Sequence, residues 1–184
     1  MSRLIAFLRA INVGGHNVAM AELRGLFEGL SFMKVETFIA SGNVIFEARS
    51  ADITTLQREI ESRLLRSLGY EVKTFLRTVP EVAAIARYKP FNKSQLSSAT
   101  AFNVAFLADP LGAEAKKSLM ALKTGIDDFH VHGREVYWLC KTKQSDSKFS
   151  NTRFERMANA RATWRNMNTV VRLAAKYGEM GDSD

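Results

Sequence analysis

Short apolar runs bounded by turn residues mark the first half of this chain. Residues 4–8, 35–40, 43–46 and 72–76 are such runs, and each has the length of a buried or half-buried strand. The dipeptide Ser41-Gly42 stands between the second and third runs, where it predicts a hairpin turn. The first half is therefore predicted to contain a small sheet.

Two segments between these runs carry apolar residues at helical spacing. The expected stripes are Met20, Leu23, Phe27 and Leu30, after Asn17 as N-cap, and Leu56, Ile60, Leu64 and Leu68, between Asp52 as N-cap and Gly69 as the residue that ends the helix. The resulting order is β-α-β-β-α-β, which is that of the split β-α-β or ferredoxin-like unit.

The second half repeats this order of elements, with no visible repeat of residues. Residues 101–107, 129–131 and 136–140 predict strands, and His132-Gly133 predicts a hairpin turn between the last two. Helices are expected after Asp109-Pro110, after a capping box from Thr152 to Glu155, and along residues 167–174. The last helix stands where a final strand would complete the unit, so the second half is expected to be β-α-β-β-α.

A polar connector separates the two halves. Thr78 and Glu81 form a predicted capping box with Pro80 near its start, and Tyr88 to Phe91 should end the short helix that follows. The expected fold class is α+β, with two ferredoxin-like halves, antiparallel sheets and a helical C-terminus. The predicted domains are residues 1–78, a connector with a short helix at 79–100, and a half ending in a basic helix at 101–184.

Composition bounds the class of protein. The chain has 184 residues, of which 46% are hydrophobic, so it can bury a substantial core. It has no apolar run long enough to span a membrane, and Arg9 interrupts the first apolar run too early for a signal peptide. Cys140 is the single cysteine, which excludes an internal disulfide. It is expected to be a packed core thiol. A cytoplasmic location is the resulting expectation.

Positive charge is concentrated near the end of the chain. Residues 148–178 carry +6 of the total charge of +7; their basic residues are Lys148, Arg153, Arg156, Arg161, Arg165, Arg172 and Lys176, opposed by Glu155. Such a segment favours an anionic partner such as nucleic acid, and is also typical of a solvated helix face.

The loop after the first strand has the features of an anion site. Asn12-Val-Gly14-Gly15 joins that strand to a helix, and Arg9 lies at the end of the strand. Glycine lets the backbone approach a ligand closely, and a helix N-terminus attracts negative charge. The loop matches neither the dinucleotide-binding pattern nor the P-loop, and a tight turn that needs positive φ is the alternative.

Three further motifs offer donors without a nucleophile. Ser41 and Asn43 flank the hairpin glycine, Lys148 follows Ser147, and Arg165, Asn166 and Asn168 precede or begin the last helix. The simpler readings are a turn, a solvated surface and a helix cap. Neither Ser41 nor Ser147 has an evident His–Asp partner, so serine catalysis is not expected.

Metal binding and standard RNA recognition are also not expected. His130 and His132 share a face of their strand, but a third metal ligand cannot be placed. The second strand of the hairpin, Asn43-Val-Ile-Phe-Glu47, lacks the aromatic pattern of RNA-recognition domains.

Four motifs together resemble the bacterial domain-of-unknown-function family numbered 1697. They are Arg9-Ala-Ile-Asn-Val-Gly-Gly15, Thr37-Phe-Ile-Ala-Ser-Gly-Asn-Val-Ile-Phe46, Ser147-Lys148, and Ala162-Thr-Trp-Arg-Asn-Met-Asn-Thr169. The resemblance implies an α+β fold of two ferredoxin-like halves and implies no activity. This chain has Ala10 where the family often has Gly, Ala40 where it often has Gln, and Met167 where it often has Trp; the change at Ala40 removes one polar group.

The leading hypothesis is a binding module for a phosphate-bearing ligand, either a nucleotide or a nucleic acid. Its expected ligand-binding residues are Arg9, Asn12, Gly14, Gly15, Ser41, Asn43, Lys148, Arg165, Asn166 and Asn168. The alternatives are a small-molecule enzyme that uses arginine, asparagine and backbone amides for electrostatic stabilisation, and a structural or interaction protein. The sequence predicts no particular cofactor and leaves the catalytic residues and oligomeric state open.

Overall fold

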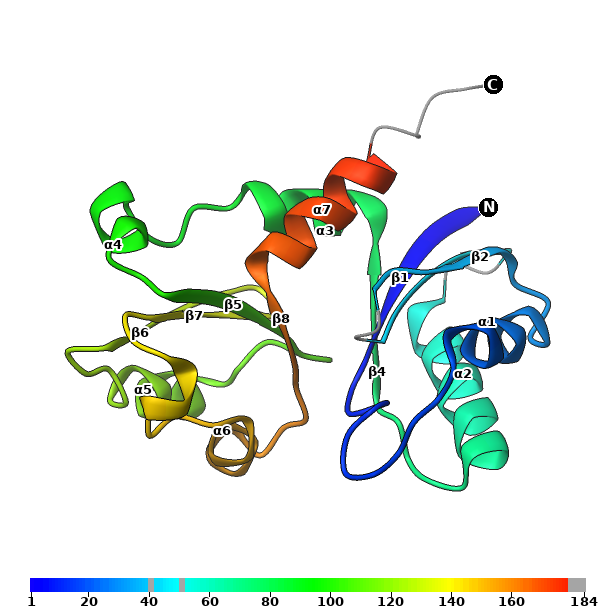
Figure 1. Ribbon diagram of the computed structural model, residues 1–184, viewed down its shortest axis with the longest axis horizontal. Helices are drawn as coiled ribbons and strands as arrows, with labels where there is room; N and C mark the ends of the chain where they lie inside the picture. Colours follow the sequence, from blue (N-terminus) through cyan, green and yellow to red (C-terminus); the bar gives the residue numbers. More distant parts are fainter. Residues whose placement is uncertain (40–41, 50–51, 179–184) are drawn as a thin grey trace. The chain divides into compact units, whose positions relative to one another are not determined.

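The computed structural model describes residues 1–39, 42–49 and 52–178. It contains two four-stranded antiparallel sheets, each covered on one face by helices (Figure 1). Ser41, which the sequence placed in a candidate site, and its neighbour Ala40 lie outside the described residues.

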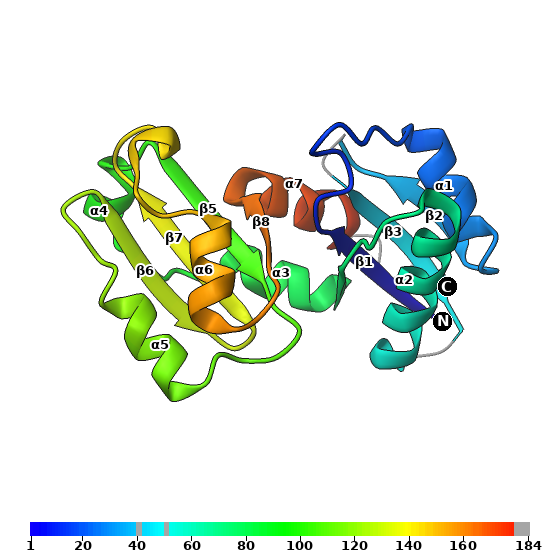
Figure 2. The ribbon, with the colours of Figure 1, turned by 90° about the horizontal axis from the view of Figure 1, so that it is seen from below.

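The first sheet has the strand order β2-β3-β1-β4. Its strands are β1 (Ser2–Leu8), β2 (Met33–Thr37), β3 (Asn43–Ala48) and β4 (Thr74–Thr78). Helices α1 (Met20–Glu28) and α2 (Ile53–Leu68) lie side by side over one face of this sheet (Figure 2). The apolar stripe predicted for α2 is buried at Leu56, Ile60 and Leu64, which explains why this face turns toward the sheet.

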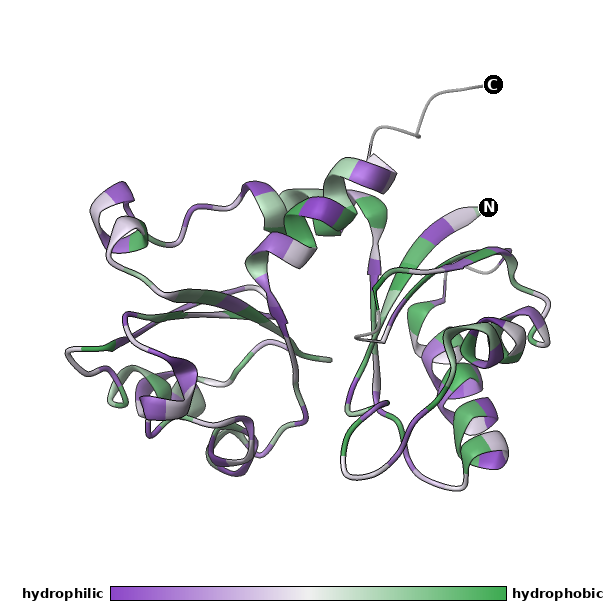
Figure 3. Cartoon of the chain, in the orientation of Figure 1, coloured by the Kyte–Doolittle hydropathy of each residue, from purple (hydrophilic) through white to green (hydrophobic). Residues whose placement is uncertain are grey.

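The second sheet has the equivalent order, β6-β7-β5-β8. Its strands are β5 (Ala101–Phe106), β6 (Asp127–His132), β7 (Glu135–Cys140) and β8 (Thr163–Asn166), and α5 (Ala113–Met120) and α6 (Asn151–Ala158) cover one face. In Figure 3, hydrophobic residues lie along β5, one of the two central strands of this sheet. The expectation that the second half lacks its last strand is wrong, because β8 completes the ferredoxin-like order.

The sequence does not predict strand β8, because this strand is short and polar. Its four residues include Thr163, Arg165 and Asn166, so they give no apolar run. Backbone pairing with β5 holds it in the sheet, and Trp164 packs against the aromatic core.

A helix follows the last strand of each half directly. Helix α3 (Val79–Arg87) follows β4, and α7 (Met167–Gly178) follows β8. The predicted connector contains a further short helix, α4 (Lys93–Ser97), whose N-cap Asn92 forms a capping box with Gln95. A short 3-10 helix, η1 (Gln144–Asp146), precedes α6.

The chain divides into two compact units, Met1–Ala84 with Leu173–Asp184, and Ile85–Arg172. The divisions therefore fall within α3 and within α7. The domain boundaries expected at residues 78 and 100 stay a prediction.

Three predicted helix caps are wrong, each by a few residues. The observed N-caps are Ala19 for α1, Gly112 for α5 and Ser150 for α6, in place of Asn17, Asp109 and Thr152. Ser150 Oγ accepts a hydrogen bond from Arg153 N, so α6 begins two residues early. The caps at Asp52 and Thr78 and the left-handed Gly69 are confirmed.

The register of the two sheets reveals a repeat at the level of residues. Ile5 on β1 pairs with Ile45 and Arg77, and Val104 on β5 pairs with Tyr137 and Arg165. Aligned on these positions, Ala6-Phe7-Leu8 coincides with Ala105-Phe106-Leu107. The two halves therefore share their topology and three successive residues at the ends of β1 and β5.

Candidate functional site

The glycine loop after β1 is held by its own side chains. Asn12 Oδ1 accepts a hydrogen bond from Val18 N at 2.7 Å, and Tyr70 Oη donates to Ile11 O at 2.9 Å. Gly14 and Gly15 are exposed and have φ of +65° and +88°. The loop is thus a turn that needs positive φ, and the oxygen of Asn12 serves the turn itself.

The loop also contains a stacked ring pair. The His16 ring lies 3.8 Å from the Tyr70 ring and nearly parallel to it. Burial and the nearby charge of Glu22 raise the pKa of Tyr70, so its hydroxyl remains a donor at neutral pH. Arg9 is half-buried, and its backbone N–H donates to Lys73 O at 2.8 Å.

Asn43 closes the hairpin between β2 and β3. It is 1% exposed, and its Nδ2 donates to Phe38 O at 3.0 Å while Phe38 N donates to Asn43 O at 2.9 Å. A hydrogen-bonded and buried amide of this kind supports the turn and is poorly placed to meet a ligand.

Ser147 belongs to a buried polar network. Its hydroxyl donates to both oxygens of Asp127, at 3.0 and 2.8 Å, and accepts from Phe149 N. Asp127 is 4% exposed and also accepts from Trp138 Nε1 at 2.8 Å. The Ser147-Lys148 motif therefore has a structural serine, whereas Lys148 itself is exposed.

Arg165 is buried in its strand. It is 8% exposed, and its guanidinium donates to Thr163 Oγ1 at 2.8 Å and Trp164 O at 2.9 Å. Burial lowers the pKa of Arg165 to about 10, so the group is still charged at neutral pH. Arg77, at the equivalent position of β4, is 1% exposed and donates to the carbonyl of Leu76, its own preceding residue.

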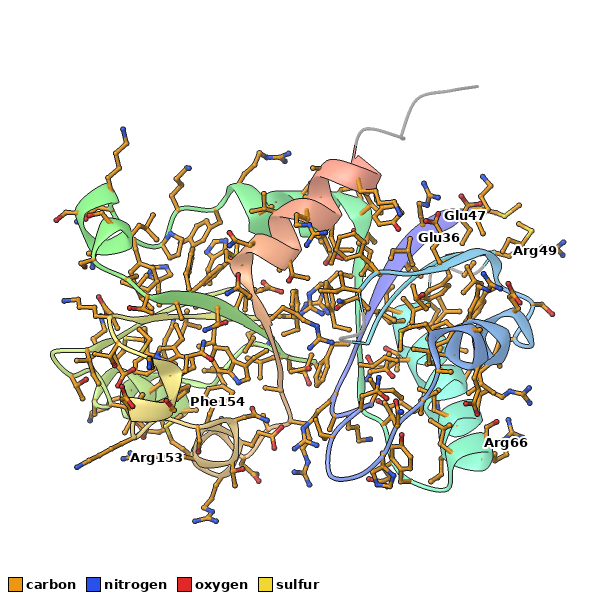
Figure 4. All side chains as sticks on the ribbon, viewed as in Figure 1. Glu36, Glu47, Arg49, Arg66, Arg153 and Phe154 are labelled. Carbon is orange, nitrogen blue, oxygen red and sulfur yellow. The ribbon has the colours of Figure 1, made fainter. Side chains whose placement is uncertain are left out.

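Internal contacts also involve other charges of the basic segment. Arg161 lies 3.3 Å from Glu155, and Lys176 lies 3.1 Å from Glu36, which stands on β2 within the first unit (Figure 4). The segment is therefore a weaker attractant for an extended anion than its charge of +6 indicates.

Asn166 and Asn168 line a pocket of about 410 Å³ in the second unit. Other residues that line it are Ala86, Tyr88, Lys89, Pro90, Leu96, Ala99, Thr100, Ala101, Phe102, Met167 and Val171. This volume lies within the usual range for small-molecule sites. Two residues predicted from the sequence thus meet in one cavity.

The backbone N–H of Asn166 points away from the sheet. Leu107 N donates to Arg134 O, so Leu107, Ala105 and Asn103 direct their N–H groups toward β7 and away from β8. Asn103 is the partner of Asn166, which is therefore a position without ladder bonds in an antiparallel pair. Because β8 is an edge strand, this N–H faces the open side of the sheet.

The equivalent N–H in the first half holds a carboxylate. Thr78 stands in the register position of Asn166, and its N–H and hydroxyl donate to Glu81 Oε2 at 2.7 and 3.0 Å. The residue equivalent to Glu81 is Thr169, which has no charge. At α7, Asn168 N instead donates to Asn166 Oδ1 at 2.9 Å.

Sequence reasoning missed most of this pocket. From the sequence, Tyr88 and Lys89 are expected to end a helix, and Thr100 is expected to belong to the connector. The available signal was the Tyr88-Lys-Pro-Phe91 segment, which combines a cation with rings next to a helix end. The predicted residues Arg9, Asn12, Gly14, Gly15 and Asn43 belong to the first unit; Lys148, Arg165, Asn166 and Asn168 belong to the second.

No metal centre is found among residues 1–39, 42–49 and 52–178, where no three His, Cys, Asp or Glu side chains are grouped suitably. His130 Nε2 lies 2.8 Å from Tyr88 Oη, and the His132 ring stacks on Tyr88. Within the same ranges, none of the helices has the length and hydropathy to cross a membrane.

A family model matches residues 1–137 of this chain, and its description is "Protein of unknown function (DUF1697)". The match covers well over half of the chain. The chain belongs to this family. Membership confirms the resemblance carried by the motifs and assigns no activity, because the description of DUF1697 gives none.

Among solved structures, this DUF1697 chain is similar to the conserved bacterial protein SP0830 from Streptococcus pneumoniae. The sequences are 21% identical, the TM-score is 0.73, and the similarity covers 95% of this chain and 97% of the other. At this identity the likeness shows the fold alone. No curated protein matches the chain.

Proposed function

We propose that the protein binds a small phosphate-bearing ligand in the pocket beside α7, which we call the α7 pocket. Its polar residues are Lys89, Thr100, Asn166 and Asn168, all in the second unit. An ammonium group and amides of this kind suit an anion that also accepts hydrogen bonds.

The comparison of the two halves carries this proposal. At the start of α3 the Glu81 carboxylate accepts from Thr78, so the fold accommodates an anion at this position. At the start of α7 the equivalent residue is the neutral Thr169, and the neighbouring Asn166 and Asn168 line a cavity together with Lys89. An external phosphate would take the place that the first half fills with its own side chain.

The substitution Thr169→Glu tests the proposal. It would give α7 the capping box that α3 already has, so we expect a stability gain of about 1 kcal/mol. The same carboxylate would repel an incoming phosphate, so the affinity for ribose 5-phosphate should fall by about tenfold or more. Thermal unfolding and isothermal titration calorimetry measure the two effects.

Two controls make this experiment decisive. Ser118→Glu adds the same charge at an exposed position on α5 outside the pocket and should leave ligand affinity unchanged. Lys89→Ala should weaken binding, while Lys93→Ala, on α4 and outside the pocket lining, should not. If the parent protein bound neither inorganic phosphate nor ribose 5-phosphate at millimolar concentrations, the proposal would be wrong.

A further inference from the structure

Part of the lining of the α7 pocket is aromatic, and we call this part its aromatic wall. Tyr88 and Phe102 line it together with the apolar side chains of Pro90, Leu96 and Val171. This wall is distinct from the polar residues on which the proposed function rests. A ligand that fills the pocket therefore needs an apolar, flat part as well as an anionic part.

Neighbouring rings hold both aromatic side chains in place. Phe102 meets Phe91 edge to face, with ring centroids 5.6 Å apart. Tyr88 stacks on His132 at 4.1 Å, and its hydroxyl lies 2.8 Å from His130 Nε2. Because these rings are already ordered, a planar ligand would stack on them at a small entropic cost.

The charge of the pocket limits the ligand to few phosphates. Lys89 is the one basic side chain among the described residues that line it. A polynucleotide or a triphosphate would bring several negative charges, and sites for such ligands have a row of cations or a bound metal. A single phosphate matches a single ammonium group.

Building on the proposed function, we infer that the ligand of the α7 pocket is a nucleoside monophosphate. Its base lies against the wall of Tyr88 and Phe102, and its phosphate lies toward Lys89, Asn166 and Asn168. The pocket volume of about 410 Å³ is of the size used by such small ligands.

Calorimetric titration of the full chain with AMP, GMP, CMP and UMP tests this inference, with ribose 5-phosphate and adenosine as partial ligands. We expect at least one nucleoside monophosphate to bind about tenfold or more tightly than ribose 5-phosphate, because stacking of the base is lost in the sugar phosphate. Adenosine should bind weakly but measurably through its base.

Two substitutions separate the base from the phosphate. Phe102→Leu should lower the affinity for the preferred monophosphate to that of ribose 5-phosphate and leave ribose 5-phosphate unchanged, while Phe102→Tyr should preserve the preference. Lys89→Ala should weaken both phosphate ligands by about tenfold and leave adenosine unchanged. Should Phe102→Leu fail to fold, Val171→Trp at a 46% exposed position would fill the pocket and abolish all binding.

The outcomes distinguish the inference from the function on which it rests. Suppose that ribose 5-phosphate and every monophosphate bind with equal affinity and that Lys89→Ala weakens them all. This result would refute the inference that the pocket recognises a nucleoside, and the proposal of a phosphate site would stand. Tight binding of a single-stranded oligonucleotide with steep salt dependence would refute the monophosphate in favour of nucleic acid. Absence of binding by all of these probes would overturn both proposals.

Discussion

Glu61 and Glu155 make equivalent contacts in the two halves: each carboxylate accepts from a backbone N–H at the start of the last strand or one residue before it. Glu61 Oε1 accepts from Thr74 N at 2.9 Å, and Glu155 Oε1 accepts from Ala162 N at 2.8 Å. Each also pairs with the basic residue just before that position, Lys73 or Arg161. This contact ties the second helix of each half to the start of the strand that follows it.

Removal of the Glu155 carboxylate should lower the free energy of unfolding more than removal of the Glu61 carboxylate. The Glu155 side chain is 7% exposed and that of Glu61 is 20% exposed. After removal of the carboxylate, the N–H of Ala162 would therefore find water as a new partner less easily than the N–H of Thr74. We expect Glu155→Ala to lower the free energy of unfolding by about 3 kcal/mol and Glu61→Ala by about 1 kcal/mol. Urea unfolding of both variants measures the difference; equal losses would contradict the burial argument.

Gly42→Ala should destabilise the first sheet by about 2 kcal/mol or more, because it combines backbone strain with a clash. Gly42 has φ of +71°, and a Cβ there would lie 2.7 Å from Cγ2 of the buried Ile11. The matched control is Gly14→Ala, where φ is +65° and no heavy atom lies within 4 Å. That variant should lose only about 1 kcal/mol, from the backbone alone. Chemical denaturation of both proteins checks the ratio.

Stability should fall on mild acidification because of His130. Burial, then the charges of His132, Lys123 and Lys116, lower the pKa of His130 below its ordinary value of 6.5, while Asp128 opposes the shift. The unfolded chain therefore binds a proton more readily than the folded one. The contribution of neutral His130 to the free energy of unfolding is complete above pH 6.5. It is lost as the pH falls from there through the lower pKa of His130 in the folded protein.

The variant His130→Gln isolates this effect. It removes the titrating ring but retains polar atoms near the hydroxyl of Tyr88. Thermal midpoints measured from about pH 7.5 to about pH 5 should drop less in the variant than in the parent. An identical drop in both proteins would assign the acid sensitivity to other groups.

Tyr177→Phe should loosen the end of α7 in the first unit. Tyr177 Oη donates to Glu36 Oε2 at 3.0 Å, and we expect a loss of about 1 kcal/mol, a typical value for one hydrogen bond. Burial alone would raise the pKa of Glu36, but hydrogen bonds from Lys176 and Tyr177 and the charges of Lys176 and Arg3 lower it overall.

The pH profile provides the matching readout. Because the folded pKa of Glu36 lies below its ordinary value of 4.5, its contribution is present above pH 4.5 and is lost as the pH falls through the folded pKa. The Tyr177→Phe variant should therefore differ most from the parent above pH 4.5. A constant difference down to the most acid pH would argue against the hydrogen bond as the cause.

Most of the fold could be predicted because hydrophobic spacing determines which faces are buried. Helix α2 has an apolar stripe, and strands β1, β3 and β7 are rich in apolar residues. The residue ranges predicted for these elements agree with the structure to within a few residues. Strand β8 and helix α4 were missed, since backbone pairing and a local capping box define them in place of an apolar pattern.

The candidate site was harder to predict because donor residues serve the fold as readily as a ligand. Asn12, Asn43 and Ser147 each hydrogen-bond a backbone or buried group, and a sequence does not show which partner such a side chain finds. Asn166 and Asn168 did meet in one pocket. Lys89 and Phe102, which complete it, come from segments that looked like a helix end and a strand.

The bond between Glu36 and Tyr177 has a consequence for the synthesis of this protein. The two residues are 141 positions apart, and Leu173 onward belongs to the same compact unit as the N-terminus. A ribosome adds about 5–20 residues per second, so many seconds pass between the synthesis of β2 and that of the helix whose Tyr177 binds it. The unit that is made first is thus the last to be completed, and a chain truncated before Leu173 would leave that unit permanently unfinished.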